Sequence, residues 1–149
     1  MRQIRALLKL SWADRLLLTQ AAVLISMTRL ALWLLPFRVV HHLSMRYLSM
    51  RSAGLIAPRP IARRPSVERV IWAVTTASHY LPSATCLAQA LATQLLLKHF
   101  GEVTQVHIGV RHDETGQFKA HAWVEHQGQI LIGGSAEEIA LFTALPSLN

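Results

Sequence analysis

The chain has 149 residues and one cysteine, so its length suits a single compact domain and an internal disulfide is excluded. The formal net charge of +7 is concentrated in the first 64 residues, which carry eleven basic side chains and a single acidic one, Asp14. Such a basic segment fits an anionic membrane surface or an acidic partner. The arginines lack interleaved aromatic residues for base stacking, so we expect no nucleic acid partner. Because a lone thiol suits a reducing compartment, we expect a cytoplasmic protein, with membrane association as an option.

An apolar run over residues 16–37 is long enough to cross a bilayer. Arg29 lies well inside this run, and an arginine at mid-bilayer is costly. The run is also too long for a signal peptide. We therefore expect a buried or partner-docking helix, with a peripheral membrane helix and a true span as the alternatives.

The first half of the chain is expected to be helical. Ser11 and Asp14 resemble a capping box, which predicts a helix over 12–35 that stops at Pro36. A second, basic helical piece follows over 37–50. Residues 51–65 are rich in proline and arginine and are typical of a linker. These patterns divide the chain into a basic, leucine-rich helical region (1–50), a linker (51–65) and a core (66–149).

The second half changes from a helical period to an alternating one. A helix capped by Ser66 is expected to end near residue 81, and a second helix, capped by Ser83 or Thr85, to end at Gly101. Strands are predicted over 103–111, 118–126 and 129–132, followed by a terminal segment that packs Ile139, Leu141 and Phe142. The fold class is therefore α+β, with N-terminal helices and then a helix packed on a small antiparallel sheet.

Cys86 lies where the second of these helices begins. A thiol attacks as its thiolate, and a helix N-terminus stabilises that negative charge. The same N–H groups can receive the oxyanion that forms when a thiolate attacks a carbonyl. Cys86 is therefore a candidate nucleophile, although most single cysteines are small buried apolar residues.

His121 is the candidate base among eight histidines. It lies centrally in a predicted strand between two alanines, which leave its ring accessible. In a strand, His121 shares one face with Trp123 and Glu125. The imidazole can reach the sulfur if this face lies against the start of the Cys86 helix. No set of cysteine, histidine and carboxylate residues has a zinc spacing, so we expect neither a metal nor a cofactor.

Two stretches, AVTTASHYLPSATCLAQALA and AHAWVEHQGQILIGG, together resemble the lasso-peptide leader peptidases, which are bacterial maturation proteases of the transglutaminase-like, papain-related superfamily. The resemblance covers about residues 66–145, and the order and separation of the two stretches agree with the family. It implies a cysteine endopeptidase with a transglutaminase- or papain-like core, which removes the leader peptide from a ribosomally made precursor. Cys86 matches the family nucleophile and His121 the family histidine.

The resemblance also implies partners: the leader region of the precursor, a separate leader-recognition protein and an ATP-dependent cyclase. The sequence departs from the family at one position, because some members carry an aspartate where this chain has Gly133. Glu125 is a weak candidate for the missing third member, with awkward geometry on the same strand. Glu137, Glu138, Asp113, an amide side chain or a backbone carbonyl are further candidates.

Two other functions remain open from the sequence. A deamidase or transpeptidase could use the same fold and the same nucleophile. A docking or scaffold subunit of a peptide-maturation complex would use the basic helical half, and Cys86 would then be structural. Thiol alkylation at neutral pH separates these cases, because a buried structural cysteine reacts slowly.

Overall fold

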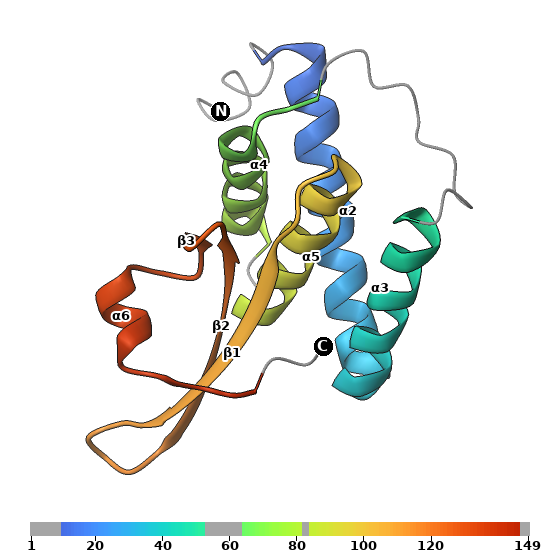
Figure 1. The fold of residues 1–149 in the computed structure, drawn as a ribbon. Coiled ribbons are helices and arrows are strands. Elements are labelled where there is room, and N and C mark those ends of the chain that lie inside the picture. Colours follow the sequence, from blue (N-terminus) through green and yellow to red (C-terminus); the bar gives the residue numbers. More distant parts are fainter. Residues whose placement is uncertain (1–9, 53–63, 82–83, 147–149) are drawn as a thin grey trace.

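The structure is a computed structural model that describes residues 10–52, 64–81 and 84–146. Helices form the first half of the chain and an antiparallel sheet most of the second half, which confirms the α+β class (Figure 1). In chain order the elements are α2 (Trp12–Leu34), α3 (Phe37–Ser52), α4 (Val67–Tyr80), α5 (Cys86–His99), β1 (Gln105–His112), β2 (Phe118–His126), β3 (Gln129–Ile132), α6 (Ala136–Ala140) and β4 (Thr143–Ala144).

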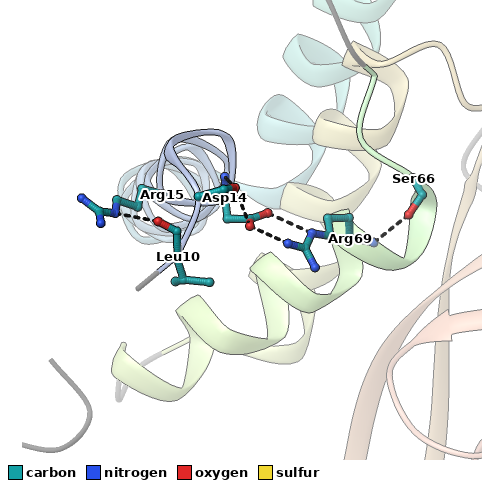
Figure 2. A network of polar contacts seen from close by, with 6 residues as sticks. Leu10, Asp14, Arg15, Ser66 and Arg69 are labelled. Atoms are coloured by element: carbon teal, nitrogen blue, oxygen red, sulfur yellow. Dashed lines mark hydrogen bonds and ion pairs between the residues drawn. The ribbon is translucent and has the colours of Figure 1, made fainter. Parts of the chain in front are cut away.

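Helix α2 begins at the expected cap. The Ser11 hydroxyl accepts a hydrogen bond from the Asp14 backbone N–H and donates one to the Asp14 carboxylate. The same carboxylate accepts two hydrogen bonds from the guanidinium of Arg69 on α4, one of them 2.8 Å long from Nε (Figure 2). These hydrogen bonds, from Ser11 first and then Arg69, lower the pKa of Asp14 below its ordinary value of 3.8. The contact ties the start of α2 to α4.

The larger hydrophobic core joins α2, α4 and α5. Apolar residues three or four positions apart point inward from each helix, as the amphipathic pattern requires. Leu17, Ala21 and Ile25 of α2 are buried in one cluster with residues of the other two helices, among them Val70 and Leu97. The basic N-terminal region therefore shares its core with the second half of the chain.

The sheet has the strand order β3-β2-β1-β4 and is antiparallel throughout. In the β1–β2 pair, Gly109 lies opposite His121 and Ile108 opposite Ala122. Strand β3 pairs with the end of β2 only as far as Val124, opposite Ile132. Beyond that point towards the start of β2, no strand of the described residues continues on the β3 side. Strand β2 therefore keeps an edge without a strand partner beside His121.

Opposite faces of β2 are covered by different parts of the chain. Ala122 and Val124 pack in a buried cluster with Ala90 of α5. Trp123 points to the other face, where its ring stacks on His107 at a centroid distance of 5.6 Å. The segment that contains α6 crosses this second side of the sheet, away from α5 (Figure 1).

Most predicted elements match within two residues, and Thr85 rather than Ser83 is the described cap of α5, since residues 82–83 lie outside the described residues. The prediction that Leu141 packs inward is wrong, because this residue is 62% exposed. Leu141 directly follows the single turn of α6 and lies on its solvent side. The division of the chain at residues 50 and 65 stays a prediction, because residues 53–63 lie outside the described part.

Candidate active site

Cys86 is the first residue of α5. Thr85 caps this helix, and its hydroxyl accepts a hydrogen bond from the Ala88 backbone N–H. The N–H groups of Cys86 and Leu87 have no carbonyl four residues earlier in the helix to bind. The positive end of the helix dipole thus lies at the sulfur. The Cys86 side chain is neither fully buried nor fully exposed.

The position of Cys86 along the sheet follows from its helical spacing. Ala90 lies one turn later on the same side of α5 and is buried against Ala122 and Val124. Cys86 itself packs against this cluster. The sulfur-bearing residue therefore lies over the part of β2 that includes Ala122, the neighbour of His121 in the chain.

His121 lies in the middle of β2, as predicted. The face of β2 that packs on α5, however, is the one that carries Ala122 and not the one that carries His121. Alternation along the strand places Ala122 towards α5, and the His121 ring instead contacts Phe142 at a centroid distance of 5.2 Å. The small Ala122 is what allows the helix to approach, since Ala90 packs directly on it. Among the described residues no hydrogen bond joins Cys86 to His121.

The His121 ring is held by the backbone of Gly133. Its Nε2 is hydrogen-bonded to the Gly133 carbonyl oxygen. A carbonyl can only accept, so Nε2 carries the proton and donates. In the neutral ring Nδ1 is then the unprotonated nitrogen, with a lone pair available to take a proton. The hydrogen bond thus determines the tautomer of the imidazole and holds one of its two nitrogens near the edge of β2.

Gly133 reaches this place only because it has no side chain. The chain passes so close to β2 that a Cβ at residue 133 would lie 2.5 Å from the Cβ of Trp123 and 2.9 Å from the carbonyl oxygen of Ala122. Its φ of +113° is also a conformation that favours glycine. The residue that departs from the family pattern is therefore the one whose backbone contacts His121.

The carboxylates considered from the sequence have other contacts. Glu125 Oε2 lies 3.5 Å from Nε2 of His107, on the neighbouring strand. Glu138 closes the capping box of α6 with Ser135. Asp113 binds the turn between β1 and β2, where hydrogen bonds from Thr115 and then Lys119 hold its pKa well below the ordinary value. None of these described contacts is with His121.

Sequence reasoning did not single out the Gly133 carbonyl or Phe142 as neighbours of His121. The signal for Gly133 was present in the pair Gly133-Gly134 directly after a predicted strand, which is typical of a close backbone approach. Phe142 gave no comparable signal, because its position depends on how the segment after β3 crosses the sheet.

A family model described as the transglutaminase-like superfamily matches residues 31–147, which is more than half of the chain. The match includes both Cys86 and His121, and begins within α2, well before the stretch that carries the resemblance seen in the sequence. No curated protein and no solved structure matches the chain.

Proposed function

The chain belongs to the transglutaminase-like superfamily, whose members are often cysteine-based enzymes that act on amides, and from this premise we propose that it is a cysteine endopeptidase that removes the leader from a lasso-peptide precursor. One observation carries the proposal: the lone cysteine is the first residue of helix α5, which packs on a strand whose histidine is hydrogen-bonded through Nε2 to a backbone carbonyl. We choose a lasso-peptide precursor as the substrate because the two stretches quoted from the sequence resemble the lasso-peptide leader peptidases.

In the proposed reaction Cys86 Sγ attacks the carbonyl carbon of the scissile peptide bond. His121 Nδ1 takes the thiol proton, and the backbone N–H of Cys86 stabilises the oxyanion. The C–N bond then breaks, and the imidazole gives its proton to the departing amine. Water hydrolyses the thioester, which returns the thiol and releases the leader with a free carboxylate.

This mechanism needs the imidazole and the sulfur to come within hydrogen-bond reach, roughly 3 Å, in the free protein as well as with substrate bound. The two residues reach the same part of β2 from opposite faces. The pairing of β3 with β2 ends where Ile132 lies opposite Val124, so within the described part of the chain the edge of β2 beside His121 has no strand partner on that side. We propose that the imidazole meets the sulfur around this edge, where an extended substrate also adds its backbone hydrogen bonds.

The Gly133 carbonyl takes the place of the orienting aspartate in the proposal. It performs the positioning role, since it accepts from Nε2 and leaves Nδ1 for the thiol. It carries no full negative charge, so it stabilises the imidazolium less than a carboxylate would. The leader-recognition protein and the ATP-dependent cyclase remain proposed partners, on the ground of the resemblance alone.

The proposal is tested with the precursor peptide, with and without a recognition protein, and a mass readout. The wild-type chain is expected to give two fragments, and Cys86→Ala and His121→Gln none. His126→Gln is the matched control, because His126 lies on the same strand and hydrogen-bonds to Val103 instead. A gain of one mass unit would identify deamidation, and cleavage by Cys86→Ala would end the proposal.

A further inference from the structure

The outer face of α2 carries a largely exposed apolar stripe. Its residues lie three, four or seven positions apart, opposite the side that carries Leu17, Ala21 and Ile25 into the core. The exposed fractions are large, at 79% for Trp12 and 80% for Trp33. The stripe consists of Trp12, Leu16, Val23, Met27, Leu30, Trp33 and Leu34.

Helix α3 extends this surface. Its exposed apolar residues also recur on one side of the helix: Val39, Leu43, Tyr47 and Met50. A cavity of about 520 Å³ opens between α2, α3 and α5. Val23, Leu43 and Tyr47 line the cavity and belong to the exposed apolar sets as well. The stripe, the cavity and the α3 residues together are called here the α2–α3 surface.

Arginines lie on both helices of the α2–α3 surface. Arg15 and Arg29 of α2 and Arg38 and Arg46 of α3 are all exposed. The single acidic residue of this half, Asp14, is buried and bound to Arg69, so it does not offset their charge at the surface. An apolar surface with exposed arginines is complementary to a lipid bilayer with anionic headgroups, because arginines bind the headgroups while apolar side chains enter the interface.

Helix α2 is long and apolar enough to cross a membrane by length and composition. A crossing would expose its inner side to lipid, and that side is buried against α4 and α5. Arg29 would also lie in the bilayer interior. The fold therefore allows α2 to lie along a membrane and not through it, with the tryptophans near its two ends at headgroup level.

We propose that the α2–α3 surface binds the surface of a membrane that contains anionic lipid, with α2 in the plane of the interface. The binding is peripheral and reversible. The proposal is independent of the reaction at Cys86, because it rests on residues outside the candidate active site.

The test is cosedimentation of the whole chain with vesicles of phosphatidylcholine alone and with vesicles in which phosphatidylglycerol replaces about a third of the lipid. Binding is expected only with the anionic vesicles and is expected to weaken as salt rises. Arg29→Gln and Arg46→Gln should each lower the partition coefficient roughly fivefold, the effect of one basic residue near such a surface. Lys119→Gln removes the same charge from the distant β1–β2 hairpin and should have little effect.

The apolar contribution is tested with Met27→Ser and Leu30→Ser, whose side chains are exposed, so that the fold should persist. The matched control is Val103→Ser, which removes an apolar residue that is 76% exposed but lies after α5. Circular dichroism establishes that each variant is folded. Binding lost in the two α2 variants and kept in the control supports the proposal. It is overturned if the folded wild-type chain fails to bind, binds neutral vesicles equally well, or binds regardless of the α2 substitutions.

Discussion

Replacement of Gly133 by alanine tests how tightly the chain after β3 is held against β2. The added Cβ would lie 2.5 Å from Trp123 Cβ, 2.8 Å from Trp123 Cα and 2.9 Å from the Ala122 carbonyl oxygen, and none of these atoms ends a flexible side chain. Ordinary contact begins near 3.4 Å, so the backbone must move by about 0.9 Å. The Gly133 carbonyl that holds His121 moves with it.

Two costs add in Gly133→Ala. A side chain at positive φ costs roughly 1–2 kcal/mol, and overpacking against rigid neighbours costs about 1–3 kcal/mol. We therefore expect a loss of about 2–5 kcal/mol in the free energy of unfolding, measured by urea denaturation. If the protein is a peptidase, cleavage should fall by roughly 100-fold, the effect of a 1 Å displacement of a catalytic group.

Gly128→Ala separates the two costs. Gly128 also has a positive φ, +79°, but no atom lies within 4 Å of the Cβ it would gain. It should lose only about 1–2 kcal/mol and keep its activity. Equal destabilisation by the two substitutions would show that Gly133 does not approach β2 closely, and the account of His121 orientation would then be wrong.

Two further predictions concern stability. Leu91→Ala should lower the free energy of unfolding, measured by urea denaturation, by about 2–5 kcal/mol, because Leu91 is fully buried. Leu141→Ala should lower it by less than about 0.5 kcal/mol, because Leu141 is exposed. Similar losses in the two variants would contradict the assignment of the core. Hydrogen bonds from Ser11 and Arg69 lower the pKa of Asp14 in the folded chain, so its stabilising effect is present above the ordinary value of 3.8 and is lost as the pH falls below it. The difference in melting temperature between the wild-type chain and Asp14→Asn should therefore be largest above about pH 5 and should shrink towards pH 3, and a difference independent of pH would refute this contribution.

Local signals in the sequence predicted most elements correctly. Ser11, Ser66 and Thr85 mark helix starts because their hydroxyls accept the free N–H groups of the first turn, and this effect needs no tertiary information. The change from helical to alternating period likewise located the β1–β2 hairpin and β3. These features depend on neighbours in the chain, so one sequence suffices to predict them.

The face of β2 that packs against α5 could not be predicted from such local signals. Alternation tells which residues share a face, but it does not tell which face a helix covers. The face of His121, Trp123 and Glu125 was placed against α5 only as the condition for the imidazole to reach the sulfur, and no local signal supported that choice. The structure buries Trp123 against His107 instead and places Ala122 under Ala90, because two small residues allow the helix and the strand to pack closely.

The partner of His121 was also beyond the sequence. Residues 121 and 133 are brought together by the path of β3 and by the close approach of Gly133 to Trp123. A backbone carbonyl was among the candidates for the third member, but no sequence signal identified the carbonyl of residue 133. The β4 strand was missed for a similar reason, since its two residues are defined only by pairing with Gly109 and Val110.

The rate of alkylation of Cys86 tests the central claim most directly, because a chain with one cysteine reports on this thiol alone. Iodoacetamide is applied at neutral pH to the wild-type chain, to His121→Gln and to the control His126→Gln, and modified protein is followed by mass. We predict rapid modification of the wild type and of His126→Gln, and modification at least roughly tenfold slower in His121→Gln, because general-base assistance contributes at least this much. Equal rates in all three proteins would contradict the pairing of Cys86 with His121.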